Sequence, residues 1–272
     1  MKFAVVSDIH GNLPALEAVL DDIRQAGAQA TLNLGDIVSG PLWPAETAAR
    51  LMALDLPTIR GNHERQLLDD VPERMGPSDA YARARLAPAQ LDWLRGLPAT
   101  RRWHDEVWCC HGTPDDDSSY FLDTVAGPGG LRAATRDEAT ARAGAALAGV
   151  AHGLILCGHS HVPRTLLLAD GRLVVNPGSV GLQAYDDAHP WDHVVENGSP
   201  HARYALLARG PAGWKVELRA VPYDHESAAR RAQAGGRGDW ADALRSGFVG
   251  RREAEVVGPA AGTPHAGGRT TP

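Results

Sequence analysis

The chain has 272 residues, of which 43% are hydrophobic and 22% are charged, and its formal net charge is −6 from 27 basic and 33 acidic residues. This length suffices for one large domain or two small ones. The acidic balance, without a basic run, argues against a mainly electrostatic grip on nucleic acid, and no stretch approaches the ~20 apolar residues of a membrane span. Three cysteines without disulfide spacing, and a start that reads as a strand and not as a signal peptide, predict a cytoplasmic location.

Strands and helices alternate over the first part of the chain. Asn12 is a suitable N-cap for the first helix, Pro14 fits its first turn and Gly27 its exit. This rhythm predicts a parallel sheet with right-handed crossovers. In chain order we expect a strand over residues 3–8, a helix over Leu13–Ala26, a strand over 30–36, a helix over Pro44–Leu54 and a third strand over 56–62.

The second half of the chain reads increasingly as antiparallel strands. Asp170-Gly171 is a two-residue turn that favours a hairpin. The expected elements are helices between residues 64 and 98, two strands over 100–112, a helix over Leu131–Val150, a buried strand over 153–159, hairpins over 164–178 and 202–221, and helix over Asp224–Ser246. We therefore divide the chain into one domain over residues 1–221, a helical extension over 222–250 and a tail over 251–272, whose Gly, Pro, Thr and Ala content predicts disorder.

Five short segments, each directly after a predicted strand, carry the side chains that suggest chemistry. Loops at the carboxyl ends of strands converge on one crevice in an open α/β sheet, so residues far apart in sequence can meet there. The segments are Asp8-Ile9-His10, Gly35-Asp36, Gly61-Asn62-His63-Glu64, Cys110-His111-Gly112 and Gly158-His159-Ser160-His161.

Asp, His and Asn supply oxygen and imidazole ligands without a thiolate, which suits Mn, Fe, Zn or similar ions. Asp8 and His10 are two residues apart, and His159 and His161 repeat that spacing. Each segment alone has an ordinary structural explanation, such as a turn, a helix cap or a hydrogen-bonded histidine. All five in this order, each at a strand end, indicate a metal site. The three cysteines are expected to pack in the core.

The ordered set DIHGN, GDIV, GNHE, CHG and GHSH resembles the calcineurin-like metallophosphoesterase superfamily, and NPGSVG at residues 176–181 resembles its small bacterial phosphodiesterase branch. The resemblance covers about residues 1–221. It implies an α/β (α+β) fold, a four-layer αββα sandwich of two mixed β-sheets flanked by helices. It also implies a cytoplasmic hydrolase that uses two divalent metal ions, with a metal-bridging hydroxide as the attacking group, on a small or nucleotide-type phosphate ester.

The same resemblance assigns roles to individual residues. Asp8, His10 and His161 would hold the first metal, and Asn62, His111 and His159 the second. Asp36 would bridge both ions, and His63 would be the catalytic histidine that faces the phosphate. Glu64 could orient His63 or simply begin a helix.

Other expectations are weaker or competing. Asn12, Tyr120 and Arg164 lie on loops that could contact substrate, and Tyr185–Ser199 is expected to form a loop at the site mouth that influences substrate size. Ser39-Gly40-Pro41 stands where Ser/Thr protein phosphatases carry a phosphate-binding arginine, which disfavours that class. Two alternatives stay open: a nuclease acting on nucleic-acid ends, and a non-enzymatic scaffold of the same fold.

Overall fold

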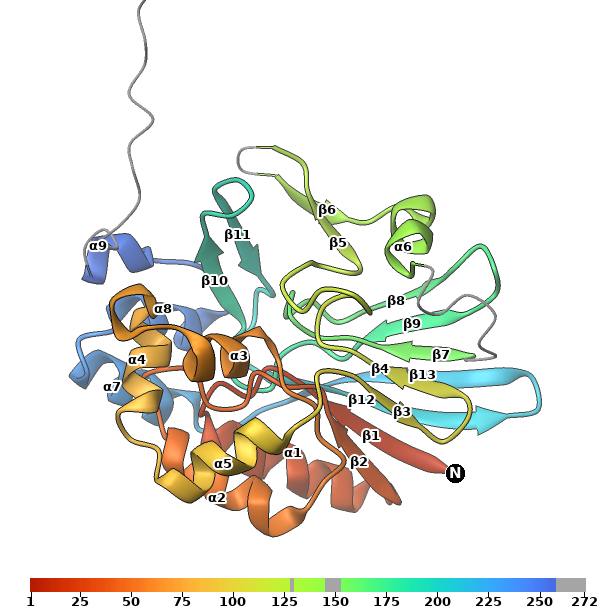
Figure 1. The fold of residues 1–272 in the computed structure, drawn as a ribbon, viewed down its shortest axis with the longest axis horizontal. Helices are drawn as coiled ribbons and strands as arrows, with labels where there is room; N and C mark the ends of the chain where they lie inside the picture. The colour runs from red at the N-terminus through yellow and green to blue at the C-terminus, as the bar shows by residue number, and fades with distance from the viewer. Residues whose placement is uncertain (128–129, 145–152, 258–272) are drawn as a thin grey trace, which may run out of the picture.

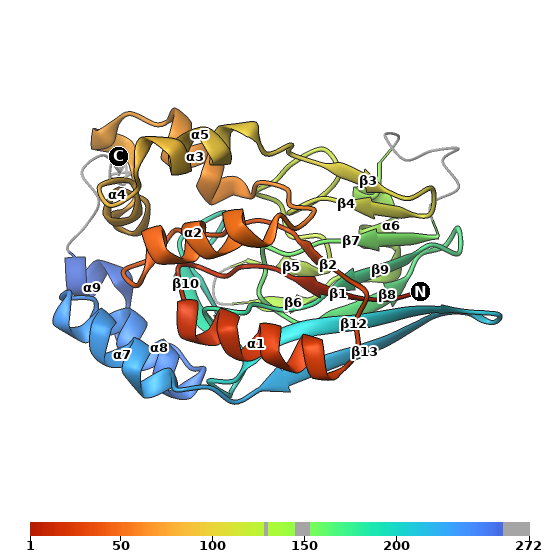
Figure 2. The same cartoon turned by 90° about the horizontal axis from the view of Figure 1, so that it is seen from below.

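The computed structural model describes residues 1–127, 130–144 and 153–257. Two mixed β-sheets face each other, and helices cover their outer faces (Figures 1 and 2). The predicted sandwich of two mixed sheets flanked by helices is confirmed. Within the described residues, every helix is too short or too polar to span a lipid bilayer.

The first sheet has the strand order β13-β12-β1-β2. Strand β1 pairs in parallel with β2 and antiparallel with β12. The expected third parallel strand is reduced to one bridge between Asn33 and Thr58, because the chain turns away at Arg60, whose N–H binds the Pro98 carbonyl. The strands are β1 (Lys2–Val6), β2 (Ala30–Asn33), β12 (Ala202–Gly210) and β13 (Gly213–Val221).

The second sheet has the order β3-β4-β7-β9-β8, with β4, β7 and β9 parallel and the edge strands antiparallel. Two separate hairpins lie beyond the sheets. The strands are β3 (Arg101–Trp103), β4 (Val107–Cys109), β7 (Leu154–Leu156), β8 (Arg164–Leu167) and β9 (Leu173–Asn176), and the hairpins are β5 (Asp123–Val125) with β6 (Leu131–Ala133) and β10 (Ala184–Asp187) with β11 (His193–Glu196).

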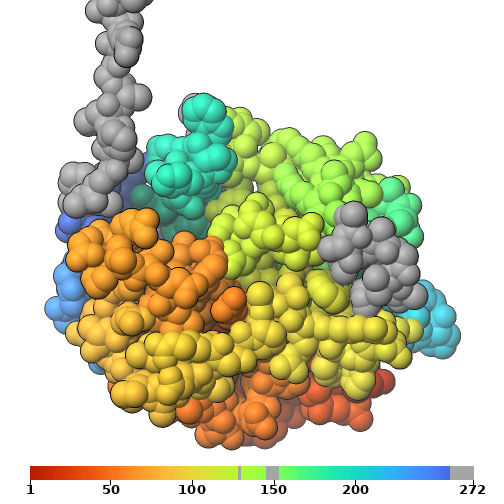
Figure 3. Space-filling view, in the orientation of Figure 1, coloured from red at the N-terminus to blue at the C-terminus, as the bar shows by residue number. Residues whose placement is uncertain are grey.

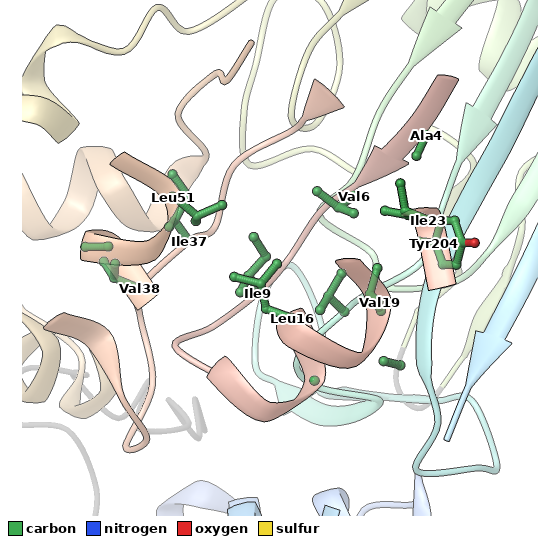
Figure 4. Close-up of a cluster of buried hydrophobic side chains, with 14 of the residues drawn as sticks. Ala4, Val6, Ile9, Leu16, Val19, Ile23, Ile37, Val38, Leu51 and Tyr204 are labelled. Carbon is green, nitrogen blue, oxygen red and sulfur yellow. The ribbon is translucent and has the colours of Figure 1, made fainter. Parts of the chain in front are cut away.

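Alternating side chains of β1 explain why this strand lies in the centre of the molecule. Phe3 and Val5 pack between the two sheets, and Ala4 and Val6 pack against the helices on the other face. Figure 4 shows this second cluster, where α1 places its apolar side chains over the sheet. Because both faces of β1 are buried, its carboxyl end is held rigidly in the interior.

The helices group by the surface that they cover. The first helices pack on the outer face of the first sheet, and α6 lies on the outer side of the second sheet (Figure 1). They are α1 (Leu13–Gln25), α2 (Pro44–Leu54), α3 (Asn62–Asp69), the short 3₁₀ helix Pro72–Arg74, α4 (Pro77–Arg83), α5 (Pro88–Gly96), α6 (Arg136–Arg142), α7 (His225–Ala234), α8 (Gly238–Ser246) and α9 (Glu253–Val257).

Two local expectations differ from the structure. The helix predicted over Leu131–Val150 was wrong at its start: Leu131–Ala133 forms β6, and Thr135 caps α6 by accepting the N–H of Glu138. Residues 145–150 of that helix lie outside the described residues. The expected loop over Tyr185–Ser199 contains the β10–β11 hairpin instead.

The C-terminal segment also differs from its prediction. Residues 251–257, expected to begin a disordered tail, include α9, and Glu253 pairs with Arg237 at 2.5 Å. Arg251 pairs with Asp242 of α8 at 2.8 Å. These ion pairs attach α9 to the extension, and they come from charged residues that precede the Gly, Pro, Thr and Ala tail. Residues 258–272 lie outside the described residues.

Candidate metal centre

The loops at the carboxyl ends of β1, β2, β4 and β7, together with the start of α3, bring the predicted ligands together. Two groups form, Asp8 with His10 and His161, and Asp36 with His111 and His159. Within each group the potential ligand atoms lie within 4.8 Å of one another. The centre is deeply buried: apart from His159, the members of these groups are at most 4% exposed.

The two groups adjoin each other. The His161 Nε2 lies 3.4 Å from the Asp8 carboxylate, and the His111 Nε2 lies 3.8 Å from the same carboxylate. The His111 Nε2 is also 3.0 Å from the Asp36 carboxylate. Two carboxylates are therefore buried in one cluster without a Lys or Arg among the described residues contacting them. Buried charges of this kind are normally paired or bind metal ions.

Hydrogen bonds to backbone carbonyls fix which ring nitrogen of each histidine faces the centre. A carbonyl oxygen only accepts, so the bonded ring nitrogen carries a proton and the other nitrogen is the one that can face the centre. Such support from a backbone carbonyl is typical of metal-binding histidines. The pairs are His10 Nδ1 with Ser39 at 2.8 Å, His111 Nδ1 with Leu34 at 2.7 Å, His161 Nδ1 with Leu182 at 2.8 Å and His159 Nε2 with Ser118 at 3.0 Å.

Lone pairs without partners show that a cation would fit here. The Nε2 atoms of His10 and His161 lie 3.1 Å apart although both Nδ1 atoms carry the proton. Burial, followed by the neighbouring His161, lowers the pKa of His10 to about 3, so this ring is neutral. The atoms Asp8 Oδ2, Asn62 Oδ1 and His111 Nε2 are also buried, with no hydrogen-bond partner among the described residues. These are donor atoms that a metal ion would satisfy.

Backbone strain gathers at the same loops. Of the seven non-glycine residues with positive φ among the described residues, five are predicted ligands. Side chains rarely adopt this region, and strained residues of this kind cluster at functional sites. Their φ values are 55° for Asp8, 51° for His10, 53° for Asp36, 66° for His159 and 60° for His161.

Glu64 stabilises the loops and does not touch His63. The fully buried Glu64 carboxylate accepts the N–H groups of Asp36 and Ile37, both at 2.8 Å, and that of Gly61 at 2.9 Å. Gly61 lies so close to Asp36 that an added Cβ would overlap the carboxylate. Glu64 does not bond the His63 ring, because its oxygens accept backbone N–H groups, but its charge contributes to the raised pKa of His63. The alternative that Glu64 begins a helix is confirmed, since it lies in the first turn of α3.

Asp79 of α4 takes the place expected for Glu64. The His63 Nδ1 lies 2.9 Å from the Asp79 carboxylate, and the His63 ring is 5.4 Å from the His10 ring. Burial alone would lower the pKa of His63, but the carboxylates of Asp79 and Asp36 raise it to about 10. The His63 N–H also donates to Asp36 at 3.1 Å. His63 is thus held next to the centre as an imidazolium.

Two of the three predicted substrate contacts have structural partners instead. Asn12 is fully buried, donates to the Gly181 carbonyl at 2.8 Å and to the Tyr223 hydroxyl at 3.0 Å, and caps α1. The Arg164 guanidinium pairs with Asp123 at 3.0 Å. Neither residue lines the cavities beside the centre, because the backbone turn at Asn12 and the register of β8 direct their polar atoms elsewhere.

Tyr120 does lie at the centre, where it pairs with Tyr185. The Tyr120 ring stacks at 5.0 Å from His159, and the Tyr185 ring lies 4.7 Å from His161. The two hydroxyls are 2.7 Å apart. Tyr120 also reaches His193 Nε2 at 3.1 Å, and because His193 Nδ1 bonds the Trp191 carbonyl, Tyr120 is the donor in that bond. This bridge joins the β10–β11 hairpin to the ligand loop.

Two cavities open beside the metal centre. The first, which we call the hairpin groove, has a volume of about 690 Å³ and is lined by Ser118, Tyr120, Thr124, Arg142, His189 and Pro190. Figure 3 shows the β10–β11 and β5–β6 hairpins next to each other at the top of this face. The second, which we call the acidic pocket, has a volume of about 280 Å³ and is lined by His63, Tyr185, Asp186, Asp187, Trp240 and Glu253.

Three residues of the site were missed by sequence reasoning: Asp79, Trp240 and Glu253. Tyr185 begins the segment that was expected at the site mouth. Asp79 lies within a polar helix, and Trp240 and Glu253 lie in the C-terminal extension, far from any ligand motif. The Asp186-Asp187 pair after Tyr185 could have indicated the acidic pocket from sequence, because two adjacent carboxylates follow the NPGSVG motif closely.

Fold and site together define a metal-dependent hydrolase of phosphate esters. The model of the calcineurin-like phosphoesterase family matches residues 1–163, which include all seven predicted ligands. The chain therefore belongs to this family, whose members are phosphoesterases that use divalent metals.

Individual relatives agree with this assignment. The uncharacterized protein MJ0912 of Methanocaldococcus jannaschii is 26% identical over 253 residues, 83% of this chain and 89% of that protein. Phosphodiesterase YfcE of Escherichia coli K12 is 43% identical over 72 residues, which are 23% of this chain and 39% of YfcE.

Two solved structures share the fold over nearly the whole chain. The metallophosphoesterase from Sphaerobacter thermophilus aligns with a TM-score of 0.68 at 23% identity, covering 91% of this chain and 99% of its own. The hypothetical protein PH1004 from Pyrococcus horikoshii OT3 gives 0.69 at 20% identity, covering 92% and 99%. Both alignments extend beyond the family model into the C-terminal part of the chain.

Proposed function

We propose that this protein hydrolyses phosphodiesters of small or nucleotide-type alcohols at a centre of two divalent metal ions. The observation that carries the proposal is the pair of adjoining ligand groups, in each of which the potential ligand atoms lie within 4.8 Å of one another. Asp8, His10 and His161 would hold one ion. Asn62, His111 and His159 would hold the other. Asp36, whose carboxylate lies 3.0 Å from the His111 Nε2, would bridge the two, as the family resemblance implies. The oxygen and imidazole donors fit Mn, Fe or Zn.

A pair of ions held in this way would supply positive charge to the phosphoryl oxygens and lower the pKa of water. The protein's own residues perform the remaining tasks. His63, kept protonated by Asp79, is placed to donate a proton to the departing alcohol oxygen. Glu64 holds the Asp36 and Asn62 loops at a fixed separation through backbone N–H groups. The hairpin groove and the acidic pocket adjoin each other, with Asn62, His159 and Asp187 lining both, and they would receive the two organic groups of a diester.

A nuclease would need a surface that attracts the polyanionic backbone. The acidic pocket argues against such a substrate because carboxylates, and no Lys or Arg among the described residues, line it. A small ester whose charge is confined to the reacting phosphate suits this environment better. The proposed location is the cytoplasm, which rests on the cysteine usage alone.

The test is a turnover measurement on purified protein freed of metal and then supplied with manganese. Bis(p-nitrophenyl) phosphate, p-nitrophenyl phosphate and an oligonucleotide would be compared. We expect manganese to restore hydrolysis of the diester, with the monoester and oligonucleotide slower, and Asp36→Ala to lower the rate more than any other ligand change. Activity that survives complete metal removal, or an oligonucleotide hydrolysed faster than the diester, would refute the proposal.

A further inference from the structure

The acidic pocket has an unusual distribution of charge for a site that handles a phosphate ester. Asp186 and Asp187 of β10 and Glu253 of α9 line it, and no Lys or Arg does so among the described residues. Asp186 accepts the Glu253 N–H at 3.2 Å, which joins the hairpin to α9. The pocket therefore has a negative wall opposite the metal centre.

Nearby cations do not cancel this charge. Arg237 contacts Glu253 at 2.5 Å, but the same guanidinium binds Asp239 at 2.6 Å, so one positive charge serves two carboxylates. Asp187 has only the His189 ring, at 3.7 Å, within ion-pair distance among the described residues. The His63 imidazolium on the pocket wall is itself paired with Asp79. Asp186 accepts the Glu253 N–H and Asp187 the His189 N–H, but neither carboxylate has a Lys or Arg partner among the described residues.

Two further features of the pocket fit an organic cation. Tyr185 and Trp240 supply aromatic surface beside the carboxylates, and aromatic rings attract ammonium groups through their negative faces. Ser39, also on the pocket wall, is fully buried and its hydroxyl has no hydrogen-bond partner among the described residues. A buried hydroxyl without a partner normally binds water or ligand, so it marks a place where a ligand atom would be accepted.

We propose, on the basis of the proposed phosphodiesterase function, that this pocket binds the leaving alcohol of a phosphodiester whose alcohol carries an ammonium group. The reacting phosphate faces the metal ligands, and the ammonium group lies among Asp186, Asp187 and the aromatic rings. A water oxygen forms the new bond to phosphorus, and the bond between phosphorus and the ammonium alcohol's oxygen breaks. That oxygen takes a proton from His63, which lies on the same pocket wall.

A matched pair of substrates separates charge from size. Methyl 2-(trimethylammonio)ethyl phosphate and its uncharged isostere methyl 3,3-dimethylbutyl phosphate have the same shape and the same reacting bond. Both release methyl phosphate, which phosphorus NMR measures. For the manganese-loaded enzyme we expect kcat/KM to be about tenfold higher for the cationic ester, from ion pairing and cation–π contact together.

Variants locate the effect. Asp186→Asn and Asp187→Asn should each lower the preference for the cationic over the neutral ester by about threefold, because each removes one negative charge from the pocket. Asp192→Asn is the matched control: it lies on the same hairpin, is 62% exposed, pairs with Arg252 and does not line the pocket. It should keep the wild-type preference. Thermal melting of each variant checks that the fold is retained.

The outcomes are distinct from a failure of the proposed function. Equal rates for the two esters, or a faster neutral ester, would overturn the cation pocket while leaving a metal-dependent phosphodiesterase in place. An equal loss of preference in Asp192→Asn would also overturn it, because the effect would then be one of overall charge. If neither these esters nor bis(p-nitrophenyl) phosphate is hydrolysed with metal present, the proposed function fails and this inference fails with it.

Discussion

At the scale of single residues, the pair formed by His63 and Asp79 has the clearest consequence for rate. The Asp79 carboxylate contacts the His63 Nδ1, so the opposite side of the ring remains available to the substrate. Asp79 acts as a positioning residue, because it holds the ring and stabilises its positive charge. Helix α4, which carries Asp79, thereby positions His63, which lies in the first turn of α3 beside the predicted ligand Asn62.

We predict that Asp79→Asn lowers the hydrolysis of alkyl diesters about 10–100-fold and that His63→Asn lowers it about 10²–10⁴-fold, since general acid catalysis is typically of that size. Both losses should be smaller for p-nitrophenyl esters, whose leaving group needs no proton. Metal content should stay unchanged in both variants. Rates over a series of leaving groups, with elemental analysis, check this, and Asp69→Asn on the exposed end of α3 is the control. A loss that is equal for all leaving groups would show that the pair is only structural.

Glu64 acts through the backbone, and its replacement tests how the two ligand loops are held together. A glutamine offers one acceptor oxygen where the carboxylate has two, so at least one of the three buried N–H groups loses its partner. We predict that Glu64→Gln lowers the free energy of unfolding by ~1–3 kcal/mol, the cost of an unsatisfied buried donor. Urea unfolding measures this, with the exposed Glu73→Gln as the control. An unchanged unfolding midpoint would contradict the role.

At the scale of elements, the C-terminal helices form part of the site. Trp240 of α8 lies 5.9 Å from the His10 ring, and Arg237 donates to Ser78, the neighbour of Asp79, at 3.0 Å. The extension therefore supports both the metal loop and the helix that holds His63. Figure 2 shows α7, α8 and α9 together at one end of the molecule, beside α4.

Truncated chains should show which C-terminal residues the site needs. Ending the chain after Val257 should leave activity and stability unchanged. Ending it after Gly250 removes Arg251 and Glu253, leaves Arg237 with fewer partners, and should cost ~1–2 kcal/mol of stability and lower activity. Melting temperature and turnover of the two proteins check this. Equal behaviour of both truncations would show that α9 contributes nothing.

At the scale of the whole molecule, the buried carboxylates connect the metal to stability. Burial raises the pKa of the Asp8 and Asp36 carboxyls, but the neighbouring histidines, chiefly His161 and His111, bring it below the usual value, so both are carboxylates that a cation can bind. Metal bound only to the folded protein adds free energy, about 2.7 kcal/mol at a hundredfold excess over Kd.

We therefore predict that chelation lowers the melting temperature by ~5–10 °C, given that a chain of this size shifts by ~2–4 °C per kcal/mol. Calorimetry with chelator, followed by addition of manganese, measures the loss and its recovery. Asp36→Asn should reduce both the drop in melting temperature on chelation and its recovery with manganese, because a ligand proposed to serve both ions is weakened. A melting temperature indifferent to metal would contradict the metal centre independently of any activity.

The sequence by itself determined the parts that depend on local pattern. The continuous burial of β1, the cap and exit of α1 and the Asp-Gly turn in the β8–β9 hairpin follow from short-range rules. The ligand motifs after strands predicted which side chains would meet, because strand ends converge in this type of sheet. Tyr120 was placed correctly near the centre on the same grounds.

Only the tertiary structure decided which residues serve the ligands. Asp79 meets His63, and Glu253 and Trp240 reach the acidic pocket, through packing between elements far apart in the chain, which leaves no periodic signal in sequence. The same limit explains Asn12 and Arg164, whose polar atoms were taken up by neighbours that no local pattern reveals. Short-range rules fix where a backbone turns, whereas the direction of a polar side chain depends on the partners that the completed fold brings to it.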